Sequence, residues 1–320
     1  MRAIGGYFEL ELSSAGRFPH SDGLLVNSGR NALEAILASL PKAAEVFVPR
    51  FTCEAVFEPF KRTNTPYIFY DVNDDLELTS LPHLSEKQYL LYTNYFGIKD
   101  QYVDCLSLHY QGHLIVDNSQ AFFNTPSNNS LAFYSPRKFV GVADGGIVIP
   151  PMPIDAPTDQ SWARMNHLLK RIDLGPSEGY RDFRENSTAL GGEPIKKMSV
   201  LTERLLKSID WEKLRYIRRQ NFKILHTELG DLNELSIPRM DTLECPMVYP
   251  FRTSHTGLRQ TLISESIYVA TYWPNVLEDN TQSSSAYKLA NSILPLPIDQ
   301  RYGIAEMKRI ARLIEQYQAN

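Results

Sequence analysis

The sequence predicts an α/β fold in which a mostly parallel sheet is covered by helices on both faces. Two observations lead to this prediction. Short apolar runs of strand length recur along the first half of the chain, and segments with a helical spacing of apolar residues separate them. Strands that are buried on both faces of a parallel sheet have near-continuous apolar runs rather than strict alternation. The succession of strand and helix segments therefore indicates two covered faces, with ligands expected at the carboxyl ends of the strands.

The elements can be placed in order along residues 24–150. The expected helices are 29–40, 53–63 and 100–112. The expected strands are 45–49, 66–72, 89–97, 113–118, 131–135 and 145–150. Ser28 stands directly before the first helix and is a candidate N-cap, because its hydroxyl oxygen can accept a backbone N–H of the first turn.

The pattern changes near Ser199. A long charged helix is expected over 199–229, and two strands and a closing helix are expected over 247–253, 267–273 and 304–318. We therefore predict a large domain over residues 1–210 and a smaller α+β domain over 211–320. The polar segments 151–160 and 173–194 are interpreted as active-site or interface loops.

Composition excludes several classes of protein. The chain has 320 residues, with 33 Lys and Arg against 37 Asp and Glu, a net charge of −4 and no basic block, so a nucleic-acid partner is not expected. The apolar runs are too short to span a membrane, and the first residues do not resemble a secretion signal. The three scattered cysteines argue against a disulfide framework, so a reducing cytoplasm is expected.

Other chemistries lack their motifs. The seven histidines show no metal-ligand spacing, and the cysteines do not suit a zinc site, so no catalytic metal is expected. The chain has no G-x-S-x-G sequence of a hydrolase and no G-x-G-x-x-G sequence of a nicotinamide enzyme.

Two strand ends carry residues that suit a polar ligand. In 27-NSGRNA-32, Ser28 and Gly29 stand at a helix start, where backbone N–H groups and the helix dipole attract a phosphate. An ordinary capped helix explains the same residues. In 117-DNSQ-120, Asp117 and Gln120 close a strand and can hold a polar ligand, although a turn-forming Asp-Asn pair is the alternative.

A third strand end carries a candidate nucleophile. Lys138 lies in 133-FYSPRKFVGVADGG-146, between two strands and ahead of a Gly-Gly turn. A lysine amine can form a covalent bond with a carbonyl ligand if its charge is destabilised, and Arg137 stands beside it. A solvated surface lysine is the alternative.

The order of these parts resembles the DegT/DnrJ/EryC1/StrS family of sugar aminotransferases, which have the aspartate-aminotransferase fold, fold type I of the pyridoxal 5′-phosphate (PLP) enzymes. Seven motifs are similar to those of the family and follow in the same order along the chain: 28-SGRNAL-33, 46-VFVPRFTCEAV-56, 69-FYDVNDD-75, 94-NYFGIKDQ-101, 115-IVDNSQAF-122, 198-MSVLTERLL-206 and 293-ILPLPIDQRYG-303. The resemblance implies a seven-stranded sheet, the PLP cofactor and a homodimer with its site between the subunits.

The resemblance also implies roles for individual residues. Lys138 matches the lysine that binds the cofactor covalently and moves the substrate proton, and Asp117 matches the carboxylate that keeps the pyridine nitrogen protonated. Gln120 matches the residue that hydrogen-bonds the phenolic oxygen of the cofactor. The phosphate loop corresponds to Ser28, Gly29 and Arg30.

The chain departs from the family pattern at several positions. Arg30 replaces a threonine, and Phe133 stands where the family has a phosphate-binding serine, for which Ser135 is the candidate substitute. Cys53 stands where an aromatic side chain often stacks on the cofactor. The residues that can stack instead are Phe51, Tyr95 and Phe96.

The predicted function is transfer of an amino group from an amino acid, expected to be glutamate, to a keto sugar that carries a nucleotide. Two alternatives remain open from the sequence. One is a sugar dehydratase or other lyase on the same fold, against which Lys138 argues, since family dehydratases have histidine there. The other is a catalytically silent binding or regulatory protein, consistent with the departures at Phe133 and Cys53.

Overall fold

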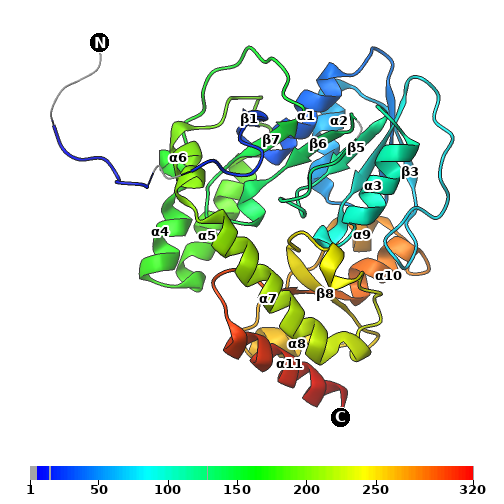
Figure 1. Cartoon of the computed structure of the whole chain (residues 1–320), viewed down its shortest axis with the longest axis vertical. Coiled ribbons are helices and arrows are strands. Elements are labelled where there is room, and N and C mark those ends of the chain that lie inside the picture. The colour runs from blue at the N-terminus through cyan, green and yellow to red at the C-terminus, as the bar shows by residue number, and fades with distance from the viewer. Residues whose placement is uncertain (1–5, 14–15, 128, 320) are drawn as a thin grey trace.

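The computed structural model describes residues 6–13, 16–127 and 129–319. Its main sheet has seven strands in the order β1-β7-β6-β5-β4-β2-β3 (Figure 1). The strands are β1 (Leu24–Val26), β2 (Glu45–Pro49), β3 (Tyr67–Tyr70), β4 (Gln88–Thr93), β5 (Leu114–Asp117), β6 (Leu131–Tyr134) and β7 (Gly146–Ile149). β7 is antiparallel to both of its neighbours, and the other pairs are parallel. The predicted fold class, a mostly parallel seven-stranded sheet, is confirmed.

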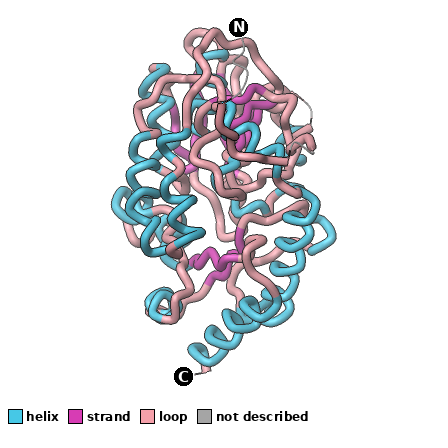
Figure 2. The backbone as a smooth tube through the Cα atoms, turned by 90° about the vertical axis from the view of Figure 1, so that its left-hand side faces the viewer, coloured by secondary structure: helices cyan, strands magenta, loops and turns pink. Residues whose placement is uncertain are grey.

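Helices lie on both sides of this sheet, as the tube view shows (Figure 2). They are α1 (Gly29–Ser39), α2 (Phe57–Thr63), α3 (Asp100–His109), α4 (Asn166–Asp173), α5 (Pro176–Ala189), α6 (Val200–Ser208), α7 (Trp211–Leu229), α8 (Leu258–Ser264), α9 (Pro274–Asp279), α10 (Ser285–Ser292) and α11 (Ile304–Gln318). None of the helices in the described ranges combines the length and apolar character needed to cross a membrane.

The strands divide their side chains between two cores because successive residues of a strand point to opposite faces. Leu91 of β4 and Ile115 of β5 pack in one core with side chains of α1 and α2. Leu90 and Val116 of the same strands pack in the other core, with side chains of α3 and α7. Both faces of the central strands are therefore buried, which explains the near-continuous apolar runs of β4 and β5 in the sequence, whereas the edge strand β3 stays largely exposed.

A second sheet of two antiparallel strands, β8 (Val248–Arg252) and β9 (Ile293–Pro297), lies in the C-terminal part of the chain. α7 runs from the region of α5 and α6 to this sheet, and α11 packs against it (Figure 1). The predicted boundary between residues 210 and 211 stays a prediction.

Three predicted elements were wrong. The segment 199–229 is two helices, α6 and α7, because the chain leaves the helical conformation at Ile209 and the side chain of Asp210 caps α7 by accepting the Lys213 N–H at 2.9 Å. The segment 173–194 is mainly the helix α5, which begins at Pro176, a residue suited to a first helical position.

The third error concerns 267–273, which forms no strand. Its alternating pattern is real, since Ile267 and Val269 are buried and Tyr268 is 63% exposed. Ile267 and Val269 pack into the core from a segment that pairs with no neighbouring strand in the described part of the chain.

Candidate functional site

The candidate residues lie at one edge of the main sheet. β1, β5 and β6 run in the same direction, because β1 and β6 are both antiparallel to β7 and β5 is parallel to β6. Their carboxyl ends therefore meet at the same edge. Ser28 follows β1, Asp117 ends β5, and a single 3₁₀ turn, Pro136–Lys138, follows β6.

Ser28 and Ser135 meet at the start of α1. The Ser28 hydroxyl oxygen accepts the Asn31 N–H at 3.1 Å and caps the helix, as the sequence predicts. Gly29 packs directly on Ser135, since a Cβ added to Gly29 would lie 3.3 Å from the Cβ of Ser135. The two serines thus flank the positive end of the α1 dipole, a position that suits an anion.

The Gly-Gly pair at the start of β7, Gly145 and Gly146, packs against the backbone of Ser28. A Cβ added to Gly146 would lie 2.1 Å from the Ser28 carbonyl oxygen, and Gly145 has a φ of +116°, which side-chain-bearing residues rarely adopt. The close approach of these two backbones therefore requires glycine at position 146.

We expect Gly146→Ala to lower the free energy of unfolding by about 1–3 kcal/mol, because the new methyl group must displace the Ser28 backbone. Thermal and urea denaturation measure the effect. Gly141→Ala is the matched control, since a Cβ there meets only the Leu168 side chain at an ordinary 3.5 Å. Equal stability of the two variants would contradict the close approach.

Asp117, Ser119 and Lys138 form a polar cluster at the same edge. The buried Asp117 carboxylate accepts the Ser119 N–H at 2.9 Å, and Lys138 Nζ donates to the Ser119 hydroxyl at 3.4 Å. Burial raises the pKa of Asp117, while the positive charge of Lys138 and the hydrogen bonds of Ser119 act in the opposite direction. Lys138 itself is exposed. The cluster therefore offers an amine open to ligands beside a buried carboxyl group.

The side-chain amide of Gln120 forms a hydrogen bond through its oxygen but not through its nitrogen among the described residues. Its Oε1 accepts the Phe96 N–H at 2.6 Å. Its Nε2 is buried, and no acceptor for it is found among the described residues. Buried amide donors nearly always have a partner, so this group is placed to donate to an acceptor that the protein chain does not supply.

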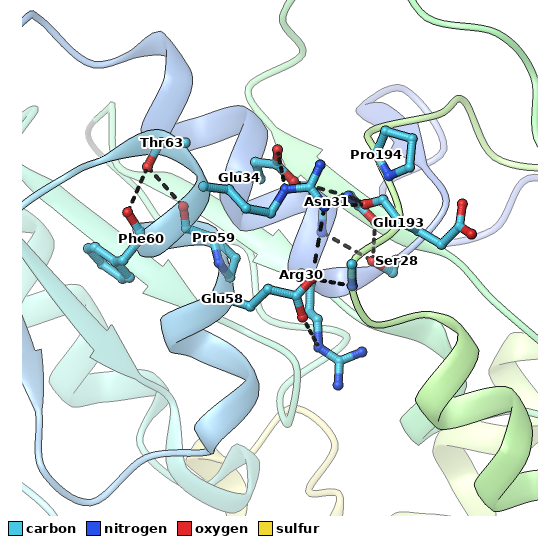
Figure 3. A network of polar contacts seen from close by, with 12 residues as sticks. Ser28, Arg30, Asn31, Glu34, Glu58, Pro59, Phe60, Thr63, Glu193 and Pro194 are labelled. Atoms are coloured by element: carbon cyan, nitrogen blue, oxygen red, sulfur yellow. Dashed lines mark hydrogen bonds and ion pairs between the residues drawn. The ribbon is translucent and has the colours of Figure 1, made fainter.

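The Arg30 side chain forms an ion pair with α2. Its Nε lies 3.3 Å from Oε2 of Glu58 on α2, so the guanidinium is paired with a carboxylate (Figure 3). Glu58 also accepts the Gly192 N–H at 2.5 Å and lies 3.9 Å from Arg62. At the helix start, the Arg30 side chain ties α1 to α2, and a role of that side chain toward a ligand stays a prediction.

The three candidate stacking residues are fully buried. Phe51 stacks on Tyr95 with ring centroids 5.3 Å apart and contacts Trp273 edge-on at 5.0 Å, and Phe96 stacks on Tyr272 at 6.2 Å. Tyr95 follows Thr93, which pairs with Asp117 across β4 and β5. Burial raises the pKa of Tyr95, and the negative charge of Asp117 adds to the effect. Which ring faces a ligand stays a prediction.

Two features of the site are absent from the sequence prediction. Ser119 links Asp117 to Lys138, and its only signal in the sequence was its place between Asp117 and Gln120. Behind Asp117 runs a chain of buried amides in which Asn94 Nδ2 donates to Asn118 Oδ1 at 3.2 Å and Asn118 Nδ2 donates to Asn124 Oδ1 at 3.0 Å.

This amide chain ends at Asp100, a buried carboxyl group. Its oxygens accept Asn94 Nδ2 at 2.7 Å and the Glu244 N–H at 3.2 Å. Burial raises the pKa of Asp100 from its ordinary value of 3.8 to about 6, against the hydrogen bonds from Asn94 and Glu244. The folded protein therefore holds this proton more tightly than the unfolded chain.

We expect Asp100 to make the free energy of unfolding fall as the pH rises from about 4 to about 6. The stability that Asp100 contributes is about 2–3 kcal/mol. It is fully present below the ordinary pKa of 3.8 and is lost as the pH rises through the folded-state pKa of about 6. Urea unfolding across this range in the wild type and in Asp100→Asn measures it. The exposed Asp75→Asn variant is the control and should keep the wild-type dependence of the free energy of unfolding on pH. If Asp100→Asn also keeps that dependence, then the raised pKa of Asp100 is wrong.

Comparison with solved structures shows the fold. DesV from S. venezuelae, solved in complex with a ketimine intermediate, has a TM-score of 0.65 and 19% identity over 92% of this chain and 84% of its own. NtdA from Bacillus subtilis, with bound cofactor PMP, has a TM-score of 0.64 and 13% identity over 93% and 73%. The sugar aminotransferase CalS13 from Micromonospora echinospora has a TM-score of 0.62 and 15% identity over 93% and 88%. No family model and no curated protein matches the sequence. The chain has the fold of these aminotransferases.

Proposed function

We propose that this chain is a divergent member of the DegT/DnrJ/EryC1/StrS family and acts as a PLP-dependent aminotransferase. The observation that carries the proposal is the cluster of Asp117, Gln120 and Lys138 at the carboxyl ends of β5 and β6. It combines a buried carboxyl group, a buried amide nitrogen with no acceptor among the described residues, and an exposed amine. The seven ordered sequence motifs and the shared fold support the same conclusion.

The residues present suit pyridoxal phosphate. Ser28, Gly29 and Ser135 surround the positive end of α1 and would hold the phosphate. Asp117 would pair with the pyridine nitrogen, and the free Nε2 of Gln120 would donate to the phenolic oxygen. Held at this site, the cofactor would supply an electron sink for the pair of electrons left when a proton leaves the substrate Cα.

The chain contributes charge and proton transfer. Asp117 is buried and held by Ser119, so its negative charge acts in a medium of low dielectric, where it is worth more than in water. Lys138 is exposed at the end of a short turn, where its amine can reach a ligand from solvent and carry a proton to or from a carbon held there. The Ser119 hydroxyl accepts from Lys138 Nζ and keeps the amine near Asp117.

The proposed reaction takes an amino group from glutamate and delivers it to a keto sugar that carries a nucleotide. The name of CalS13 supports a sugar acceptor. We also propose a homodimer, supported by the exposed apolar side chains that gather near and on α4 and α5: Trp162, Ile172, Leu174 and Tyr180. The three free thiols, Cys53, Cys105 and Cys245, fit the proposed cytoplasmic location.

The proposed function is tested by the two halves of the reaction measured separately. The purified protein is loaded with pyridoxal phosphate and mixed with glutamate, and we expect 2-oxoglutarate in an amount equal to the bound cofactor, with loss of its visible absorbance. Nucleotide-linked keto sugars are then expected to restore the absorbance. A loaded protein that releases no oxo acid with glutamate or any other amino acid would contradict an aminotransferase.

A further inference from the structure

Arg218, in the middle of α7, is a buried cation that the proposed chemistry does not use. Only 2% of its surface is exposed. Its Nη2 donates to the Phe139 carbonyl at 3.1 Å, its Nη1 donates to the Met247 carbonyl at 2.9 Å, and its Nε donates to Gln300 Oε1 at 3.0 Å. No carboxylate in the described part of the chain forms an ion pair with it. Burial lowers the pKa of this guanidinium.

Phe139 is the residue directly after Lys138. Its carbonyl also accepts Gln300 Nε2 at 3.0 Å, so two side chains from the C-terminal part hold one oxygen. The Arg218 guanidinium lies 4.7 Å from the centroid of the Phe139 ring, and that ring packs on Phe122 with centroids 5.6 Å apart. Backbone and ring of Phe139 are thus both fixed.

The contacts of Arg218 join three segments that are far apart in the sequence. Met247 precedes β8, Gln300 follows β9, and Phe139 belongs to the turn that carries Lys138. A buried guanidinium without an ion-paired carboxylate is costly, and its hydrogen bonds to oxygen acceptors and its contact with the Phe139 ring offset that cost. A methionine of similar size would fill the same space without those bonds. The buried Arg218 guanidinium therefore costs stability but fixes the position of the Phe139 carbonyl.

We propose that Arg218, together with Gln300, is a positioning residue that fixes Lys138 through the Phe139 carbonyl and couples the reactive lysine to the C-terminal unit. The inference rests on the proposed function, because it assigns the contact a purpose only if Lys138 carries the chemistry. We call the hydrogen bonds of Arg218 and Gln300 to the Phe139 carbonyl the latch. Without the latch, Lys138 would be present but less well positioned, and the orientation of a reacting group contributes strongly to the reaction rate.

The matched control lies one turn further along the same helix. Asn221 is equally buried, and its Nδ2 donates to the carbonyls of Ile298 at 3.1 Å and Tyr302 at 3.0 Å. It ties α7 to the segment after β9, and among the described residues it forms no hydrogen bond with Phe139. Asn221→Ala therefore removes buried hydrogen bonds of the same helix and leaves the hydrogen bonds of Arg218 and Gln300 to the Phe139 carbonyl in place.

Hydrogen exchange of the full chain tests the latch. In Arg218→Met we expect amide exchange in residues 137–142 to be faster by about tenfold or more, relative to the rest of the chain, whereas Asn221→Ala leaves that segment unchanged. Gln300→Ala, a milder change, is expected to raise exchange in the same segment and serves if Arg218→Met does not fold. Equal exchange in all variants, or a uniform rise along the chain, would overturn the proposal.

The loaded protein gives a second readout. We expect Arg218→Met to shift the pH midpoint of the visible absorbance of the Lys138-bound cofactor and to lower kcat with little change in KM for glutamate, and Arg218→Lys to restore part of both. Asn221→Ala is expected to leave the midpoint unchanged. A wild type that takes up no pyridoxal phosphate would refute the proposed function, while the exchange experiment would still decide whether Arg218 holds the turn.

Discussion

Replacing Lys138 by alanine is expected to lower the rate of amino transfer by at least about 10⁴-fold, because one change removes both the covalent attachment of the cofactor and the group that moves the proton. The fold should survive. Lys138 is exposed, and the one hydrogen bond of its side chain among the described residues, to Ser119 at 3.4 Å, contributes little to stability. Steady-state rates with glutamate and circular dichroism measure the two effects.

A lysine that pairs on the surface is the control for this change. The Lys207 amine on α6 pairs with Glu203 of the same helix at 2.6 Å, so Lys207→Ala should keep the wild-type rate. Small primary amines added to Lys138→Ala should restore part of the activity, since they supply the missing amine in solution. A Lys138→Ala protein that works at the wild-type rate would favour the silent or regulatory alternative.

Replacing Asp117 by asparagine is expected to lower kcat by about 10²–10³-fold while the protein still folds and binds the cofactor. Asparagine has nearly the same shape as aspartate. Its side-chain oxygen can still accept the Ser119 N–H, which lies 2.9 Å from the Asp117 oxygen in the wild type. It carries no negative charge, so the pyridine nitrogen loses the partner that keeps it protonated. Rates and cofactor affinity of the purified variant separate the two roles.

Ser119→Ala is the matched control, because it removes a hydroxyl from the cluster and leaves the charge of Asp117. We expect its kcat to fall by less than about tenfold, in line with the loss of one neutral hydrogen bond. If Asp117→Asn and Ser119→Ala lose activity equally, then the negative charge of Asp117 does not contribute to catalysis. The proposed role of this carboxylate would then be wrong.

The sequence predicts the sheet and the gathering of the site because both depend on local patterns. Strand-length apolar runs identify the strands, and parallel strands bring Asp117 and Ser135 to one edge whatever the details of packing. Gln120 follows Asp117 by three residues, so its place at the same edge comes with the strand end.

Contacts between distant segments could not be predicted in this way. Nothing near Arg30 in the sequence indicates that Glu58 will neutralise its charge, and nothing in the pattern of α7 indicates that Arg218 will reach the carbonyl of Phe139, 79 positions away. α5 was missed because its sequence is polar and contains turn-forming residues, and its helix depends on packing with α4.

The site of covalent cofactor attachment tests the proposed role of Lys138 most directly. The wild-type protein is incubated with pyridoxal phosphate, reduced with borohydride, digested and examined by mass spectrometry. We expect one modified lysine, Lys138, with about one equivalent bound, and glutamate added before reduction should diminish the modification. Modification spread over surface lysines, or none at all, would contradict an enzyme built around Lys138.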